Sequence, residues 1–242
     1  KSKNRPMGLS WYPVVSAEKI TAYEAKPWFG GVAGSPDVKE SIGEIEGQLK
    51  RLGLVGDMTM YFLYEAADAL LRIENCKLSL DALVVDVIPS FYTEESQLAK
   101  LIQLYKDQPV DRSRLIMTVP EAILLSANEE TTEVIRRYLK NGFPLMVDGW
   151  HPERYPLEKL KEMGFAYVRP DPALLLKKEM AALLTVLPSN GITVYACGVD
   201  NKDAMLWLAA CGVTHMIGTI TGHAVDEDGL IRDSLLGERI DG

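Results

Sequence analysis

Short apolar segments alternate with helical segments along almost the whole chain, and this alternation limits the folds that the chain can adopt. Several of the apolar segments are continuous runs without regular polar positions, which is typical of strands covered on both faces. Strands are predicted at 9–15, 20–29, 82–88, 114–119, 144–150, 165–169, 192–199 and 213–218. The chain is therefore predicted to form a largely parallel sheet whose strands are joined by helices.

Helical patterns fill the segments between these strands. Apolar side chains recur at helical spacing, and an N-capping residue or a terminal glycine marks several ends, as at Asn128 and Gly142. Helices are predicted at 43–73 (with a break between 53 and 56), from 93 onward, and at 128–140, 156–163, 172–187 and 201–211.

The number of strands favours a closed barrel over an open sheet. Strand and helix repeat about every 25 to 35 residues, as right-handed crossovers between parallel strands require. The first two strands are separated only by the letters SAEK, so they have no room for a helix and are expected to pair antiparallel. The predicted fold class is α/β, a modified (β/α)8 TIM-like barrel with an antiparallel first strand pair.

We expect one barrel domain over residues 9–223. Residues 1–8 are predicted to be a linker, and residues 224–242 a C-terminal tail of doubtful order, because this stretch is acidic and punctuated by glycine. The first residue is Lys1 and not Met, which suggests a piece of a longer protein.

Composition excludes several classes of function. The net charge of -8, without any run of Lys or Arg, argues against a protein that binds nucleic acid polymers. No apolar run reaches the roughly 18 to 20 residues of a membrane span. The three cysteines are widely spaced and form no metal-binding motif, so we expect reduced thiols and a cytoplasmic location.

Acidic residues stand at the carboxyl ends of four predicted strands, where parallel barrels build their functional sites. These residues are Glu24, Asp86, Asp148 and Asp200. Helix capping or a surface ion pair explains any single one of them, but capping does not explain acids on four different strands. Together they predict a metal site, living or vestigial, in the barrel mouth.

The order of these pieces resembles the EAL domain family, whose members linearise cyclic di-GMP on a modified (β/α)8 barrel. The resemblance runs from Trp11 to about Gly222. The opening stretch YPVVSAEKITAYEA is similar to the start of that family. Glu24, Ala25 and Lys26 stand at its signature tripeptide, which here is EAK.

The resemblance implies a site for about two Mg²⁺ or Mn²⁺ ions, which activate the water that attacks phosphorus. Glu24 matches the signature glutamate, and Asp148 matches the first acid of the Asp-Asp-Phe-Gly-Thr-Gly motif. Asp86 stands where the family has an asparagine, and Asp200 matches the last acid of Glu-Gly-Val-Glu. We expect these four to be vestigial metal ligands that hold one ion at most.

Other matched positions have lost the chemistry of the family. Thr118, Gly149 and Cys197 replace three acids, whereas Glu121 matches a second glutamate of the family. Arg169 replaces the lysine expected to act on the attacking water or the phosphate, and an arginine cannot take up a proton. Two cations would repel each other in such a site. We therefore expect no catalysis by the route of the family, and Arg169 is expected to be a vestige of a catalytic residue. No cofactor is expected to be required, and binding of Mg²⁺ or Mn²⁺ is kept as the alternative.

Ligand binding is left open by the sequence. Trp28 stands where active relatives carry an arginine that grips a phosphate, and losing such a clamp weakens binding. Trp28 and Arg169 are the candidate ligand contacts. Trp28 and Trp150 could stack on guanine, although packing in the core is the simpler explanation of both indoles. Arg154 lies in the altered loop and is a further candidate contact for the phosphate.

Four hypotheses about function follow. The first is a catalytically silent regulatory or protein-interaction module, with a protein partner or a linked signalling domain. The second is a cyclic di-GMP receptor, and the third is a weakly active phosphodiesterase with an altered metal site. An unrelated barrel enzyme is the fourth, because barrels support many chemistries.

Overall fold

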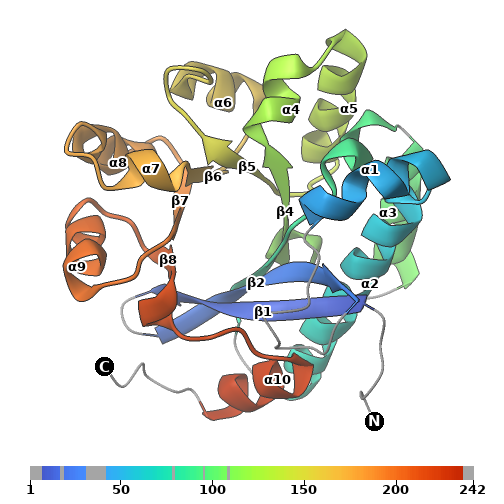
Figure 1. Cartoon of the computed structure of the whole chain (residues 1–242), viewed down its shortest axis with the longest axis horizontal. Coiled ribbons are helices and arrows are strands. Elements are labelled where there is room, and N and C mark those ends of the chain that lie inside the picture. Colours follow the sequence, from blue (N-terminus) through green and yellow to red (C-terminus); the bar gives the residue numbers. More distant parts are fainter. Residues whose placement is uncertain are drawn as a thin grey trace.

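The computed structural model describes residues 7–16, 19–30, 42–77, 80–94, 96–107 and 110–236. Their strands follow one another in chain order around a closed barrel, and helices surround it (Figure 1). The strands are β1 (Met7–Ser16), β2 (Lys19–Phe29), β3 (Ala82–Val85), β4 (Leu115–Pro120), β5 (Leu145–Trp150), β6 (Tyr167–Pro170), β7 (Thr193–Cys197) and β8 (His215–Ile217). All eight predicted strands are thus confirmed within a few residues.

The first strand runs against its two neighbours. β1 pairs antiparallel with β2 from Met7 opposite Phe29 to Ser16 opposite Lys19, and it closes the barrel antiparallel to β8. From β2 to β8 every neighbouring pair is parallel. The predicted fold class, a modified (β/α)8 barrel with an antiparallel first pair, is confirmed.

Helices cover the outside of this barrel. They are α1 (Ile42–Leu52), α2 (Val55–Asn75), α3 (Ser96–Asp107), α4 (Glu121–Ser126), α5 (Glu129–Lys140), α6 (Leu157–Met163), α7 (Pro172–Leu175), α8 (Met180–Ser189), α9 (Lys202–Ala210) and α10 (Glu227–Leu236). The break inside 43–73 is confirmed between α1 and α2. The Asn128 cap is confirmed too, since its side chain accepts a hydrogen bond from the Thr131 amide at 2.8 Å.

Two helical predictions need correction. The segment predicted as one helix at 172–187 contains α7 and α8, two separate helices. The helix expected from Thr93 starts later, because residues Pro89–Thr93 form a 3-10 turn that comes before α3. Short elements of this kind depend on tertiary packing, which periodicity does not report.

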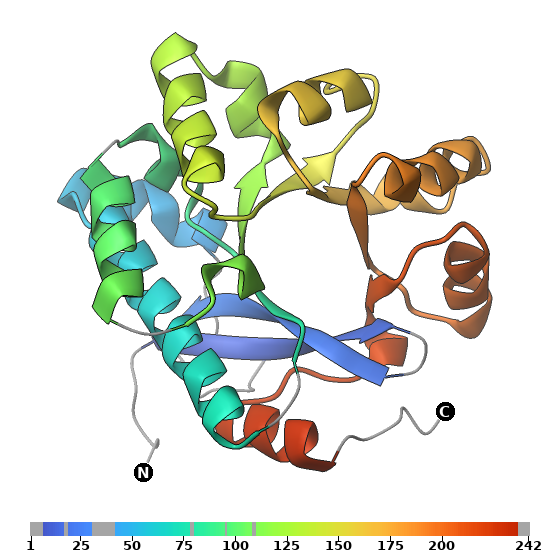
Figure 2. The same cartoon turned by 180° about the vertical axis from the view of Figure 1, so that it is seen from behind.

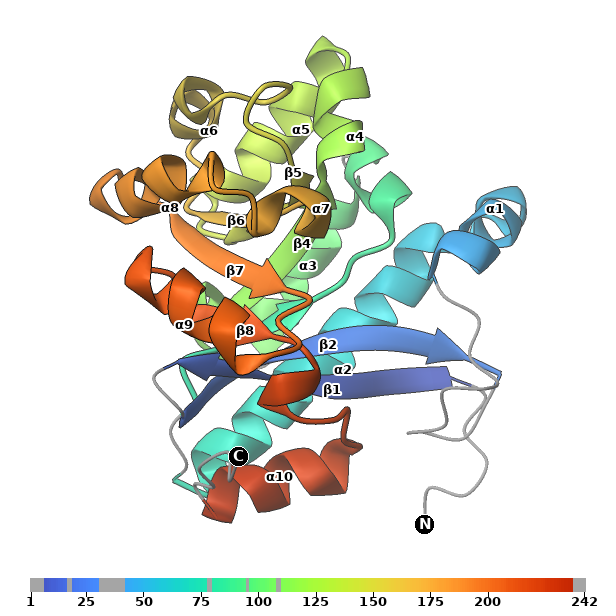
Figure 3. The ribbon, with the colours of Figure 1, turned by 60° about the vertical axis from the view of Figure 1, so that its left-hand side comes forward.

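The C-terminal stretch 224–242 contains ordered structure where we expected a tail of doubtful order. Trp11 and Val225 exchange two backbone hydrogen bonds of 2.9 and 2.8 Å, and α10 packs against β1 and α2. Leu230 of α10 is fully buried. Figures 2 and 3 show α10 beside the β1–β2 pair. Residues 1–6 and 237–242 lie outside the described residues.

The interior of the barrel is filled by one small apolar cluster. It consists of Val14, Ala22, Ala82, Val84, Ile116, Met146, Tyr195 and Ile217. A larger cluster fills the space between the strands and the helices. The barrel is therefore a packed core, and room for a polar site exists only beyond the ends of its strands. Of the helices that the structure describes, none has the length and apolar character to cross a membrane.

The packing after β8 leaves no space for a side chain at Gly218. A Cβ placed there would lie 2.0 Å from the backbone oxygen of Val199, which cannot move without displacing the chain. We predict that Gly218→Ala lowers the free energy of unfolding by about 3 kcal/mol. Chemical denaturation measures this change.

The matched control is Gly47→Ala in α1. No atom lies within 4 Å of a Cβ added at Gly47, so this variant should be stabilised by about 0.5 to 1 kcal/mol, since alanine favours helices. A Gly218→Ala protein as stable as the native chain would contradict the close packing of Gly218 against Val199.

Candidate functional site

Strand periodicity places charged residues just above the packed interior of the barrel. Alternate residues of a strand face the same side, so a residue two positions after an interior one points the same way. Such neighbours are Ala22 and Glu24 on β2, Val84 and Asp86 at the end of β3, Met146 and Asp148 on β5, and Tyr167 and Arg169 on β6. The parallel register of the strands brings these four charged residues to one mouth of the barrel.

Arg169 is the centre of this group. Its Nη1 pairs with Glu24, its Nη2 lies 3.1 Å from an oxygen of Asp86, and its Nε lies 2.5 Å from an oxygen of Asp148. Asp148 and Arg169 are register partners on β5 and β6, which accounts for their close contact. Each nitrogen of the guanidinium thus faces a different carboxylate, an arrangement that suits its planar fork of donors.

These groups are withdrawn from water to different degrees. Glu24 is completely buried and Arg169 is only 6% exposed, whereas Asp86 and Asp148 are partly accessible. Burial raises the pKa of Glu24, and the nearby Arg169 opposes this shift. Burial acts to lower the pKa of Arg169, but Glu24 and Asp86 outweigh it and raise that pKa well above its usual value. Arg169 therefore stays positively charged.

Lys26 is a second cation at the cluster. Its Nζ lies 3.5 Å from the Oε2 atom of Glu24. Burial acts to lower its pKa, yet Glu24 and Asp86 raise it overall. The three carboxylates around Arg169 thus stand beside one buried cation, Arg169, and one partly exposed cation, Lys26, which pairs with Glu24 alone among them. Lys26 was not among the predicted site residues, although its position two residues after Glu24 on the same strand was a usable signal.

Three of the four acids predicted as metal ligands meet in this cluster, and Asp200 does not. Asp200 is exposed and accepts hydrogen bonds of 3.0 Å from the amide and the hydroxyl of Thr219. These bonds lower the pKa of Asp200. In the described part of the chain no ion pair joins Asp200 to Arg169, so its observed role is to hold the turn after β8.

The positions that have lost acids are also engaged elsewhere. The hydroxyl of Thr118, a buried residue, accepts a hydrogen bond of 3.1 Å from the Val87 amide. Gly149 adopts a left-handed backbone conformation at a bulge between β5 and β6. Burial raises the pKa of the Cys197 thiol to about 12, with a smaller contribution from Glu24, so this sulfur stays protonated.

The altered loop after β5 is fixed by Glu121. One oxygen of this buried carboxylate accepts a hydrogen bond of 2.7 Å from the His151 amide, and the other pairs with Arg154 at 2.7 Å. The indole of Trp150 is fully buried and donates a hydrogen bond of 2.6 Å to the Tyr155 carbonyl. Arg154 and Trp150, which the sequence suggested as ligand contacts, therefore hold the loop in place.

Trp28, the other predicted ligand contact, belongs to the core. It is 4% exposed, and its ring lies so close to Gly8 that a Cβ there would come within 2.9 Å. Arg169, its predicted companion, is engaged with three carboxylates. Neither side chain presents a free face to a ligand in this structure.

The residues of the cluster do not fit a pair of Mg²⁺ or Mn²⁺ ions. The carboxylates that would hold the ions already face the guanidinium, and a second cation stands beside Glu24. Among the residues that the structure describes, no group of three or more His, Cys, Asp or Glu side chains is arranged to hold a metal ion. The cluster is therefore an ion-pair network built from the chain's own charges.

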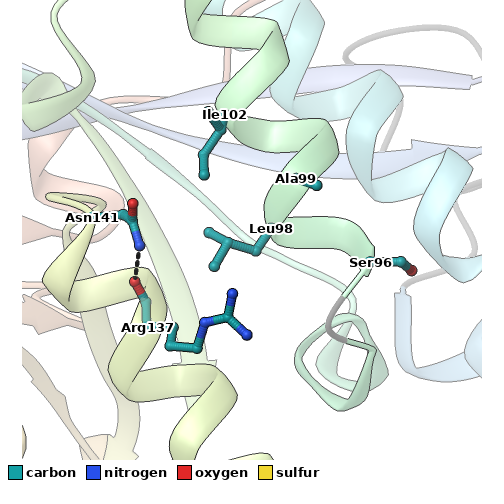
Figure 4. Close-up of a pocket in the computed structure, with 6 residues that line it drawn as sticks. All are labelled: Ser96, Leu98, Ala99, Ile102, Arg137 and Asn141. Atoms are coloured by element: carbon teal, nitrogen blue, oxygen red, sulfur yellow. Dashed lines mark hydrogen bonds between the residues drawn. The ribbon is translucent and has the colours of Figure 1, made fainter.

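Cavities lined by described residues lie elsewhere on the molecule, and two of them are of similar size. One of about 480 Å³ lies between α3 and α5 and is lined by Leu98, Ile102 and Arg137 among others (Figure 4). Another of about 490 Å³ lies between the loop after β5 and the α7–α8 segment, beside His151 and Lys177. Neither is lined by a residue of the Arg169 cluster.

The comparisons with known proteins decide the family. A family model of the EAL domain matches residues 7–224, which is most of the chain. The chain belongs to the EAL domain family. No curated protein matches it.

Solved structures share the fold of this EAL domain. The PaMucR phosphodiesterase in complex with c-di-GMP is 16% identical, with 93% of this chain and 94% of that chain covered and a TM-score of 0.78. The FimX EAL domain from Pseudomonas aeruginosa, bound to c-di-GMP, is 14% identical, with 92% and 93% covered and a TM-score of 0.76. The EAL domain of Mycobacterium smegmatis DcpA is 14% identical, with 96% and 99% covered and a TM-score of 0.74.

The contrast between two of the cysteines gives a test of the mouth. Cys76 is exposed, whereas Cys197 is partly accessible and lies at the cluster with a pKa of about 12. At a pH of about 8, only a fraction of about 10⁻⁴ of a thiol with this pKa is in the thiolate form. Thiolate is the form that reacts with labelling reagents. We predict fast labelling of Cys76 by a thiol reagent and no labelling of Cys197 on the same timescale, as measured by mass spectrometry of peptides.

A Cys76→Ser variant should lose the fast phase of labelling and keep its fold. Equal labelling rates at Cys76 and Cys197 in the native protein would contradict the raised pKa of the Cys197 thiol.

Proposed function

We propose that this EAL domain is catalytically silent and acts as a regulatory or protein-interaction module. The observation that carries the proposal is the position of Arg169 among Glu24, Asp86 and Asp148. These carboxylates are the ones that the family resemblance assigns to metal binding. In this chain they neutralise an internal cation instead.

Electrostatics supports the absence of a two-ion site. Two unit charges about 4 Å apart interact by about 4 kcal/mol at an effective dielectric constant of about 20, and a divalent ion doubles the repulsion that it meets from Arg169. Lys26 adds further repulsion. Three carboxylates cannot offset two divalent ions in addition to these two cations.

Neither cation of the cluster, nor its buried glutamate, suits the role of a base for the attacking water. Arg169 and Lys26 both have raised pKa values and stay protonated, so neither accepts a proton. Glu24 has a raised pKa, but its side chain is completely buried against the guanidinium and out of reach of water. The two partly accessible carboxylates, Asp86 and Asp148, already pair with Arg169, which weakens them as general bases.

We predict no measurable hydrolysis of cyclic di-GMP by the chain with either Mn²⁺ or Mg²⁺. The assay follows the linear dinucleotide by chromatography, beside an active EAL phosphodiesterase as positive control. Without metal activation of water the rate should fall at least about 10³-fold below that of the control. Turnover within about tenfold of the control would refute the proposal.

A cyclic di-GMP receptor is the second candidate, because several solved EAL structures that share this fold carry c-di-GMP. Against it stands the engagement of Arg169 and the burial of Trp28, which leave no free phosphate clamp among these residues. We therefore predict no heat of binding in calorimetry with cyclic di-GMP at about 100 μM. A Kd of about 1 μM would make the receptor the better description.

A regulatory role needs a partner, which we propose to be another protein or a linked signalling domain. Exposed leucines, Leu52 at the end of α1 and Leu206 on α9, offer apolar contacts outside the mouth. We propose a cytoplasmic location, on the ground that the three cysteines are widely spaced in the sequence and form no paired motif.

A further inference from the structure

The mouth of this barrel contains a cation that belongs to the chain itself. Glu24, Asp86 and Asp148 come from three different strands or strand ends, and the guanidinium of Arg169 contacts all three. Arg169 and Glu24 are 145 residues apart in the sequence, and both are buried. A contact of this kind joins opposite parts of the barrel in the way that a bound ion would.

One carboxylate oxygen of the cluster has no hydrogen-bond donor among the described residues. The Oε2 atom of Glu24 is buried and accepts no hydrogen bond among the described residues, and its nearest cation is Lys26 at 3.5 Å. Three carboxylates facing two cations leave one formal negative charge. The cluster therefore keeps an excess of hard oxygen ligands, the type that Mg²⁺ and Mn²⁺ prefer.

We propose that Arg169 is the resident cation of the barrel mouth. Its guanidinium holds Glu24, Asp86 and Asp148 together and excludes divalent ions from the native chain. Removing the guanidinium opens a site for one divalent cation of the Mg²⁺ and Mn²⁺ class. In the native EAL domain, Arg169 thus takes the place of the metal ions that the family resemblance implies. This explains why the residues of the mouth do not fit a metal pair.

Charge sets the number of ions that the opened site can take. Without Arg169, the three carboxylates face Lys26 alone, and two formal negative charges are left. One divalent ion balances them, whereas a second would leave an excess of positive charge. The stoichiometry expected for the variant is therefore one ion per chain.

The test uses Arg169→Met, which removes the charge and keeps an unbranched apolar side chain to fill much of the space. Binding is measured by the loss of the electron paramagnetic resonance signal of free Mn²⁺. We expect one Mn²⁺ per chain with a Kd of about 100 μM or tighter, the range of weak oxygen-ligand sites. With about 1 mM MnCl2 its melting temperature should rise by about 3 °C.

Three other proteins complete the experiment. The native chain should bind no Mn²⁺ and melt at the same temperature with and without it. Arg136→Met removes an arginine that pairs with Glu133 on the outer helix α5, and it should behave like the native chain. The double variant Arg169→Met with Asp148→Asn should bind Mn²⁺ at least about tenfold more weakly than Arg169→Met, because a charged ligand is lost.

Each outcome of this experiment decides for or against the resident cation. Mn²⁺ binding by the native chain as tight as by Arg169→Met would overturn the proposal, and so would a folded Arg169→Met that binds none. If this variant is recovered only from the insoluble fraction, its refolding yield is measured with and without MnCl2. A higher yield with Mn²⁺ supports the proposal, and equal yields contradict it.

The proposal about Arg169 rests on one part of the proposed function, namely that the barrel mouth of the native chain holds no pair of metal ions. The two can fail separately. Hydrolysis of cyclic di-GMP by the native chain would refute the silent domain, whereas Mn²⁺ bound by the native chain without turnover would refute only the role of Arg169 as resident cation.

Discussion

Charge balance inside a closed barrel is the constraint on which this structure depends. Carboxylates that converge in a place of little water stay together only beside positive charge, because an isolated buried anion is very costly. Arg169 and Lys26 provide that charge from β6 and β2. In this structure the carboxylates pair with the guanidinium, and a single side chain reaches three separate strand ends.

Much of the fold was predictable, because continuous apolar runs and the short gap before β2 specify buried parallel strands and one antiparallel pair. The short helix α4 and the terminal helix α10 were not, since they depend on contacts such as that between Trp11 and Val225. The convergence of Glu24, Asp86 and Asp148 was also predictable, because parallel strands end at one mouth.

The pairing within that convergence was not predictable. A sequence shows that Arg169 replaces a lysine, but it does not show which carboxylates the guanidinium contacts across the barrel. Asp200 illustrates the opposite error. It matches an acid of the family motif, yet it lies three residues past Cys197, the last residue of β7. Its side chain is therefore outside the mouth and accepts a hydrogen bond from Thr219.

The attachment of the loop after β5 to Glu121 has a consequence for recognition. A rim that is already held by a buried carboxylate has lost most of its conformational freedom before any encounter, so a partner that docks there pays little to order it. Such a surface suits fast, shape-selective association with a rigid counterpart. It suits poorly an induced closure over a small molecule, which would first have to separate Arg154 from Glu121.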